Sequence, residues 1–212
     1  IKIATGSVLK DNNGILYPIR KGIGITLDKE FWMPESGEAE FQLTFPPIPQ
    51  NVTRLDFSEG DFEGAYKIWG IQLDKKSFGK FKLPKDVIVP KADHKMTLPD
   101  PIVKYDKAIL KGRILDYQKG MPDKGSLYYQ DVIREGAQEG KIRIQDDGTF
   151  YHEMNVFMIT PCTIMFPFGT IEYLLAPGET TSIVINLREN ARKQSHLRQA
   201  EKPYGKEVYY GG

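Results

Sequence analysis

The sequence has a single cysteine, only three histidines and almost no net charge. With Cys162 alone, the chain cannot form an internal disulfide or a CxxC redox pair. The longest apolar stretch, residues 157–168, is interrupted by proline and threonine and is shorter than the roughly 18 apolar residues of a membrane helix. A net charge of +1 gives no overall field to attract nucleic acid or an anionic membrane. The residues therefore exclude a self-contained dithiol enzyme and argue against a membrane-spanning or nucleic-acid-binding protein.

The composition is that of a globular protein, with 40% hydrophobic and 27% charged residues. The 212 residues suffice for one large or two small domains, at roughly 100–200 residues per domain. The chain opens at Ile1, inside what we interpret as a strand, with no initiator methionine or signal peptide before it. We therefore expect a part of a longer protein, whose first domain lacks its first strands.

Alternation of apolar and polar residues predicts a mostly-β chain. In residues 39–45 every second side chain is apolar, which indicates a strand with one buried face, and the prolines that follow end it. A further strand begins at Leu55 and Phe57 and ends in the turn-rich residues 58–61. Residues 65–73 are apolar on both faces, so we expect them to form a central strand of a sandwich.

Residues 82–101 are rich in proline, lysine and aspartate, which predicts an extended linker between two domains. The predicted fold is mostly β, with two small β-sandwich domains, immunoglobulin-like or related, and a short C-terminal helix. The expected boundaries are a first sandwich over residues 1–83, a linker over 84–104, a second sandwich over 105–187 and a helical tail over 188–212.

A glycine loop specifies the register of one hairpin in the second domain. A two-residue turn at this point would set Ile144 opposite Tyr151 and place Phe150 on the wrong face. A three-residue loop over residues 146–148, with Gly148 left-handed, pairs Ile144 with Phe150 and keeps the apolar face whole. We therefore predict the three-residue loop.

The end of the second domain combines a turn with a polar helix. Proline followed by glycine in residues 176–179 is typical of a type II turn, so we predict a hairpin between residues 171–175 and 181–187. Residues 189–202 are polar nearly all round and form helices readily. An isolated helix of this length is marginal, so we expect it to need a partner. The apolar residues that could dock it are Ala191, Leu197 and Ala200.

Residue types that carry catalysis or bind metals are present without a complete motif. Cys162 has no cationic neighbour in sequence, which favours a buried structural thiol over a reactive one. The histidines, His94, His152 and His196, share no ligand spacing, and we expect His152 at the edge of the core with a hydrogen-bond partner. The densest carboxylate group fits no EF-hand and is interpreted as an exposed turn; its members are Asp56, Glu59, Asp61 and Glu63. We predict no catalytic residue, no metal site and no cofactor.

Aromatic residues are the remaining functional signal. Paired rings at strand ends can form a platform for a sugar or a peptide. The candidates for such binding are Trp32, Tyr128 and Tyr129. The alternative is that both faces of these strands are covered, in which case the rings belong to the core.

Several stretches resemble a known family. Residues 31–37 (FWMPESG) and 55–73 resemble the N-terminal region of envelope proteins of Gram-negative anaerobes that end in a thioredoxin-like domain of the TlpA/AhpC-TSA class. The second domain resembles the small β domain that often precedes this thioredoxin unit. The segments that carry this second likeness are residues 108–117, 146–150 and 173–187.

The resemblance implies an exported thiol–disulfide oxidoreductase of the bacterial periplasm or cell envelope, anchored through a lipid. It places the catalytic CxxC beyond residue 212, and no redox-active residue can be carried over to this chain. The implied partner is the downstream thioredoxin-like domain of the same parent, or a partner protein. Membrane contact is expected only through an upstream anchor, nucleic acid is not expected, and a symmetry mate that covers the helix would make a homodimer.

Three functions follow as hypotheses. The preferred one is a non-catalytic accessory or scaffold segment of the exported oxidoreductase-like parent. The alternative is a stand-alone envelope module that binds glycan or peptide through exposed aromatic rings. A weaker third hypothesis is a hydrolase, which would require two carboxylates that converge in a cleft with displaced pKa values.

Overall fold

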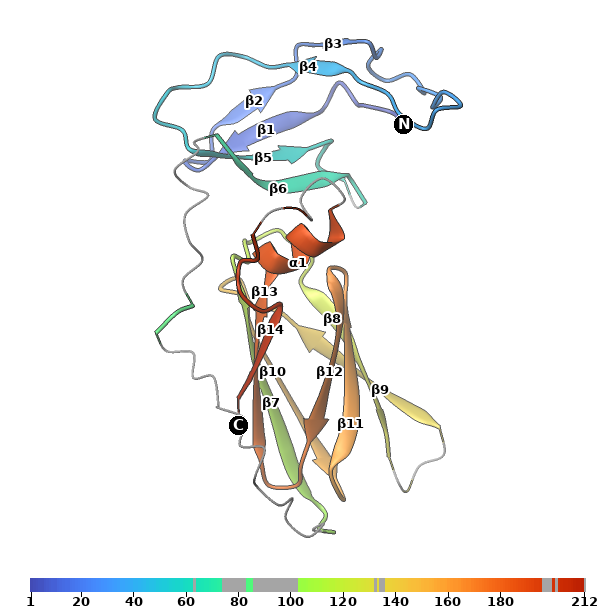
Figure 1. The fold of residues 1–212 in the computed structure, drawn as a ribbon, viewed down its shortest axis with the longest axis vertical. Coiled ribbons are helices and arrows are strands. Elements are labelled where there is room, and N and C mark those ends of the chain that lie inside the picture. The colour runs from blue at the N-terminus through green and yellow to red at the C-terminus, as the bar shows by residue number, and fades with distance from the viewer. Residues whose placement is uncertain are drawn as a thin grey trace. The chain divides into compact units, whose positions relative to one another are not determined.

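The computed structural model describes residues 1–62, 64–73, 83–85, 103–131, 133, 136–195, 200 and 202–211. The chain divides into two compact units, Ile1–Lys80 and Phe81–Gly212. Both consist of β-sheets, and a single short helix lies near the C-terminus of the described part (Figure 1). The structure thus confirms the mostly-β fold class. Most of the predicted linker, residues 86–102, lies outside the described residues.

The first unit is a small two-layer arrangement. A four-stranded sheet in the order β2-β1-β5-β6 forms one layer, and the pair β3-β4 forms the other (Figure 1). Leu9, Leu55 and Phe57 form the centre of its core, and Leu43 of β4 packs against them. The strands are β1 (Val8–Asp11), β2 (Leu16–Pro18), β3 (Lys21–Ile23), β4 (Gln42–Thr44), β5 (Arg54–Ser58) and β6 (Lys67–Gln72).

The strand β5 confirms the prediction around Leu55, but β6 corrects the next one. Residues 65–73 were expected in the centre of a sandwich, whereas β6 is the last strand of its sheet among the described residues. The apolar residues of this stretch do not alternate because a bulge interrupts the strand. Ile68 pairs with Phe57 and Ile71 with Leu55, so the register shifts between these pairs, and Gly70 has a φ of 73°. The Gly70 N–H donates to Oδ1 of Asp56 at 2.8 Å, so the chain leaves the regular ladder there.

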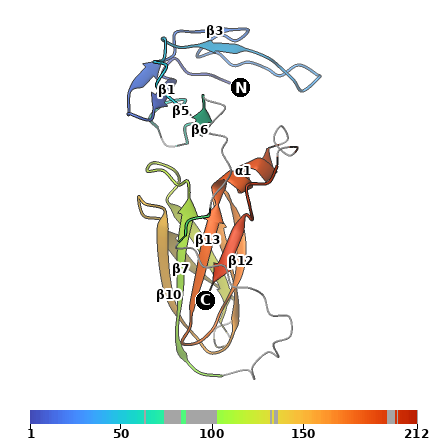
Figure 2. The ribbon, with the colours of Figure 1, turned by 60° about the vertical axis from the view of Figure 1, so that its left-hand side comes forward.

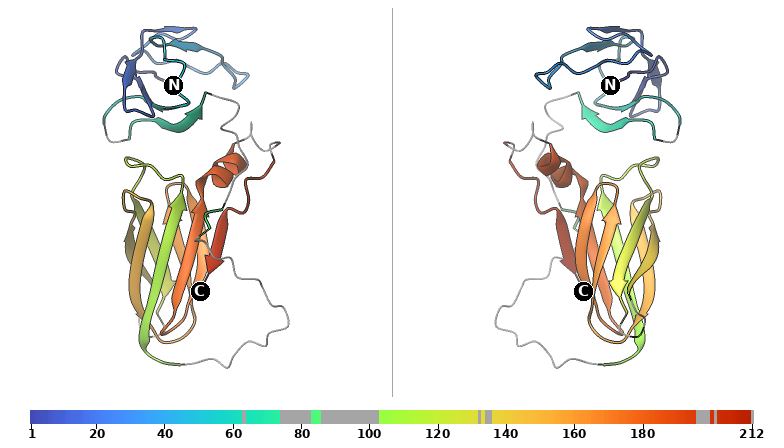
Figure 3. Two further views of the ribbon diagram at one scale, coloured as in Figure 1. Left: turned by 90° about the vertical axis from the view of Figure 1, so that its left-hand side faces the viewer. Right: turned by 90° about the vertical axis from the view of Figure 1, so that its right-hand side faces the viewer.

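The second unit is a sandwich of two four-stranded sheets, in the orders β10-β7-β13-β14 and β12-β11-β8-β9. Figures 2 and 3 show the two layers, with helix α1 at one end. The first strand, β7, pairs in parallel with the seventh, β13. This order differs from that of an immunoglobulin constant domain, in which the first strand pairs with the second. The strands are β7 (Asp106–Leu115), β8 (Lys124–Gln130), β9 (Ala137–Arg143), β10 (Thr149–Val156), β11 (Thr160–Phe166), β12 (Gly169–Leu175), β13 (Thr180–Asn186) and β14 (Val208–Gly211).

Alternating side chains from both sheets fill the space between them. Leu110, Leu127, Ile164 and Ile183 are almost completely buried and come from four different strands. A second kind of contact is made by a glycine. The Phe150 ring lies over Gly112, its cross-strand partner, so closely that a Cβ atom there would be 1.8 Å from Phe150 Cζ. The packing of the core therefore requires glycine at this position.

The predicted three-residue loop is confirmed. Ile144 forms a bridge with Phe150, the Gly148 N–H donates to the Gln145 carbonyl at 2.9 Å, and Gly148 has a φ of 82°. The strands on either side belong to different sheets, since β9 pairs with β8 and β10 pairs with β7. The loop therefore turns a corner of the sandwich.

The turn at residues 176–179 is also confirmed, but the hairpin around it is wrong. The Glu179 N–H donates to the Ala176 carbonyl at 3.2 Å, and Gly178 has a φ of 81°, as a type II turn requires. However, β12 and β13 lie in different sheets. The physical reason is that the apolar faces of the two strands meet across the core, whereas a hairpin would place them side by side in one layer.

Helix α1 (Leu187–Gln194) is docked differently from the prediction. Ala191 and Ala200 are exposed, and Leu197 lies outside the described residues. The helix instead buries a charged pair, Glu189 and Arg192, against its own unit. Sequence reasoning also missed β14, which follows the helix and adds to β13 as an antiparallel strand. The predicted helical tail is therefore a helix followed by a strand.

Candidate functional site

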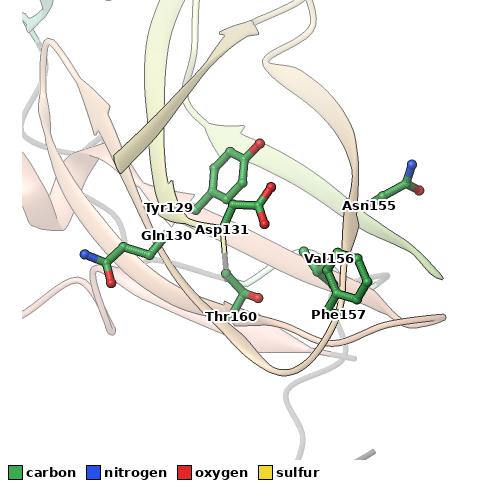
Figure 4. A pocket seen from close by; sticks show the side chains of 7 residues that line it. All are labelled: Tyr129, Gln130, Asp131, Asn155, Val156, Phe157 and Thr160. Carbon is green, nitrogen blue, oxygen red and sulfur yellow. The ribbon is translucent and has the colours of Figure 1, made fainter. Parts of the chain in front are cut away.

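A small depression lies at one end of the second sandwich, where β8 and β10 end and β11 begins. Tyr129 and Gln130 end β8, Asp131 follows them, and Thr160 is the first residue of β11. In Figure 4 these side chains surround one side of the depression, and those from the end of β10 form the other side. Those residues are Asn155 and Val156, which end β10, and Phe157, which follows it. The lining thus combines aromatic rings, amides and a carboxylate.

Several polar groups of the depression already have partners. The Thr160 hydroxyl donates to the Met158 carbonyl at 2.8 Å, and Oδ1 of Asp131 accepts from the Ile133 N–H at 2.9 Å. The Asn155 amide donates to the hydroxyl of Tyr105 at 3.2 Å. These bonds fix the walls of the depression.

An aromatic pair stands beside the depression. The rings of Tyr105 and Phe157 have centroids 4.4 Å apart and planes tilted by 35°. Tyr105 is 60% exposed, so one ring of the pair faces solvent. The depression has a volume of only about 10 Å³, room for about one water molecule. A ligand larger than water would rest on the rim and against the rings.

The three predicted binding aromatics do not lie on one face. Tyr129 lines the depression and packs partly against the core. Tyr128 is the preceding residue of β8 and therefore points to the outer face, opposite Thr163. Trp32 belongs to the first unit, where it is 82% exposed. Of the predicted residues, only Tyr129 contributes to the depression.

Sequence reasoning missed Tyr105, Asn155 and Phe157. Tyr105 and Asn155 lie 50 residues apart in the chain, and no local pattern links them. The sequence signal for this site was an aromatic residue at each of two strand ends: Tyr105 immediately before β7 and Phe157 immediately after β10. It becomes useful only once the antiparallel pairing of these two strands is known.

Cys162 is buried in the core, as predicted. It is 3% exposed and lies directly opposite Tyr173 on the neighbouring strand. Burial raises the pKa of the Cys162 thiol to about 11, and burial also raises the pKa of Tyr173. At neutral pH the thiol is therefore protonated and shielded, which makes it a poor nucleophile.

His152 lies at the edge of the core, but its surroundings differ from the prediction. Its ring packs over Gly140 of β9, where a Cβ atom would be 3.1 Å from ring atoms. Burial lowers the pKa of His152. Among the residues that the structure describes, no hydrogen bond to this ring is formed. The expected hydrogen-bond partner is thus replaced by a packing contact.

The carboxylates around residues 56–63 are only partly described, because Glu63 falls outside the described residues. Asp56 accepts the Gly70 N–H that forms the β6 bulge. Within the described ranges, no group of three or more His, Cys, Asp or Glu side chains is placed to hold a metal ion. No helix among these residues has the length and apolarity to cross a bilayer.

The chain was also compared with known proteins. No protein-family model, no curated protein and no solved structure matches it.

Proposed function

We propose that this chain is a non-catalytic accessory segment of an exported thiol–disulfide oxidoreductase-like protein of the bacterial envelope. The observation that carries the proposal is the fixed position of its C-terminal strand. The Asn186 side chain donates to the carbonyls of Tyr204 and Lys206, at 2.7 and 3.2 Å, and β14 continues the sheet from there. A domain that follows β14 would start from a strand built into the sandwich, and this suits a spacer.

The state of Cys162 supports the same proposal. The only thiol of the chain is buried and has a raised pKa, so thiol–disulfide chemistry would have to come from another segment or another protein. The proposed partner is a thioredoxin-like domain of the same parent. Membrane association would be supplied by an anchor upstream of this chain.

A reductase assay tests the proposal. We expect this chain alone to be inactive in dithiothreitol-driven insulin reduction, and its Cys162→Ala variant to behave identically. We expect the natural full-length protein to be active, because the CxxC would lie outside this chain. Insulin reduction by the chain alone that is lost in Cys162→Ala would contradict the proposal. An inactive full-length protein without a CxxC would also contradict it.

The depression at Tyr129 favours a second candidate function, a binding module for glycan or peptide. Rings that stack on a sugar face, together with amides and a carboxylate that bond hydroxyl groups, are the usual means of such recognition. The Tyr105–Phe157 pair, in which the Tyr105 ring is exposed, supplies the stacking surface. The small volume of the depression indicates weak binding on the surface.

A titration followed by NMR tests this second function. Neutral oligosaccharides and short peptides are added to the labelled chain, and shift changes are expected at Tyr105, Tyr129 and Phe157. Tyr129→Ala should weaken binding about tenfold, the scale of one good contact. Tyr128→Ala is the matched control, because that ring lies on the other face of β8. Equal effects of the two substitutions, or no shifts at these residues, would refute this function.

A further inference from the structure

The two outer strands of the β12-β11-β8-β9 sheet differ in whether other residues form hydrogen bonds to their outer edges. Side chains from elsewhere in the unit occupy the edge of β12. The Thr181 hydroxyl donates to the Leu174 carbonyl and the Tyr210 hydroxyl donates to the Glu172 carbonyl, both at 2.9 Å. Gln194 donates to the Phe168 carbonyl, just before β12, at 3.1 Å. This edge is blocked against a further strand.

The other outer strand, β9, has an open edge (Figure 1). The Ile144 N–H donates to the Asp123 carbonyl at 2.8 Å, in the same register that pairs Arg143 with Lys124. Residues that bond across an antiparallel ladder alternate, so every second residue before Ile144 bonds to β8. Ala137, Glu139 and Lys141 therefore direct their N–H and C=O groups away from β8.

No partner meets these groups within the part of the chain that the structure describes. Beyond Lys141 the chain turns toward β10 through the Ile144–Phe150 bridge. The open edge consequently runs over Ala137–Lys141. Neither proline nor a bulge interrupts it, and these are two of the usual means of protecting an edge strand.

The side chains along this edge are complementary to a second copy of themselves. Glu139 and Lys141 lie on the same outer face, two residues apart, with Gly140 between them facing the interior. If two β9 strands pair antiparallel about a two-fold axis at Gly140, Glu139 of each faces Lys141 of the other. Both residues of each pair have backbone groups directed outward, so each pair can exchange two hydrogen bonds. A lysine alone on an edge would repel a second strand, whereas here it meets a carboxylate.

We propose that β9 is a homodimerisation edge. Two copies pair through Glu139–Lys141 about a two-fold axis at Gly140, and the two four-stranded sheets join into one continuous sheet. The contact is isologous, so it closes at the dimer and does not propagate into a filament. This interface is independent of the proposed accessory function and of the Tyr129 depression.

The charge pattern allows a test with its own rescue. Sedimentation velocity over a concentration series should show a monomer–dimer equilibrium for the unaltered chain. Lys141→Glu and Glu139→Lys should each weaken dimerisation at least about tenfold, because both cross-strand pairs become repulsive. The double variant E139K/K141E should restore dimerisation, since it only exchanges the two charges.

Mixing the two single variants gives the sharpest result. Each alone repels itself, but a K141E chain presents carboxylates opposite the ammonium groups of an E139K chain, so the mixture should form heterodimers. Both positions are on an exposed edge, and circular dichroism is expected to show unchanged folds. A chain that stays monomeric at all concentrations would overturn the proposal. Dimerisation that is equally strong in both single variants would overturn it as well. So would single variants that fail to associate when mixed.

Discussion

Replacing Arg192 with alanine should lower the free energy of unfolding of the second unit by about 3–5 kcal/mol. The Arg192 guanidinium donates to both carboxylate oxygens of Glu189, at 2.9 and 2.6 Å, and Glu189 is 1% exposed. Without Arg192, a carboxylate would remain buried with little compensation for its lost hydration. The Tyr204 N–H, which also donates to Glu189, would be the main remaining partner.

Urea unfolding followed by far-ultraviolet circular dichroism measures this loss. Both tryptophans, Trp32 and Trp69, belong to the first unit, so tryptophan fluorescence reports that unit separately and should be unchanged. The matched control is Lys193→Ala, which removes an exposed ion pair with Glu207 and should cost about 1 kcal/mol or less. A cost for Arg192→Ala no greater than that of the control would contradict the prediction.

The same pair predicts a dependence of stability on pH. The hydrogen bond from Arg192 holds the pKa of Glu189 below its ordinary value of 4.5. The unfolded state therefore binds the proton more readily, and the contribution of the pair is fully present above about pH 4.5. It is lost as the pH falls through the lowered folded-state pKa. In Arg192→Ala this part of the acid-induced fall in stability should disappear.

Adding one methyl group at Gly112 should also destabilise the second unit, by about 1–3 kcal/mol or more. The new Cβ atom of Gly112→Ala would fall 1.8 Å from Phe150 Cζ, and Phe150 is itself 3% exposed in the core. The ring has no open space to enter, so neighbouring side chains must shift. Urea unfolding by circular dichroism again gives the cost.

A double-mutant cycle separates this clash from a general effect of alanine in a strand. Phe150→Ala alone should cost about 3–5 kcal/mol. In that background, Gly112→Ala should add little, because the ring it would strike is gone. Gly6→Ala, in a turn of the first unit where the nearest atom to the new Cβ would be 4.0 Å away, is a control for a methyl group added in open space, and it should change stability by less than about 0.5 kcal/mol. If the losses of stability at Gly112 and Phe150 were additive, the close contact between them would not be the cause of the loss in Gly112→Ala.

Local physics explains which parts of the fold the sequence predicts. Gly148 must adopt a positive φ, and the apolar alternation on both sides then admits one register, so the Ile144–Phe150 bridge was predictable. Which strands pair with β9 and β10 could not be predicted, because this pairing depends on residues far away in the chain. The turn at residues 176–179 has the same chemistry whether the flanking strands pair or face each other across a core. Only the packing of both sheets decides between these arrangements.

The helix and the candidate site show the same limit. A polar helix suggests an exposed one, yet α1 buries Glu189 because Arg192 and a backbone N–H from Tyr204 complete its hydrogen bonds. In the site, period-two alternation implies that Tyr128 and Tyr129 face opposite ways, and this could have been anticipated. The meeting of Asn155 with Tyr105 could not, since it requires β7 and β10 to be neighbours.

The parallel pairing of β7 with β13 has a consequence for synthesis and folding. Ile109 lies opposite Thr180, so the central ladder of one sheet joins the beginning of the domain to its end. During translation, β7 must wait until most of the domain has left the ribosome before it meets this partner. Contacts between residues so distant in sequence slow folding. The chain between them must lose conformational entropy before the contacts of the ladder can compensate for that loss. The nascent domain would thus expose unpaired strands for longer than a domain built of hairpins, and a holdase chaperone that covers β7 would be most useful in that interval.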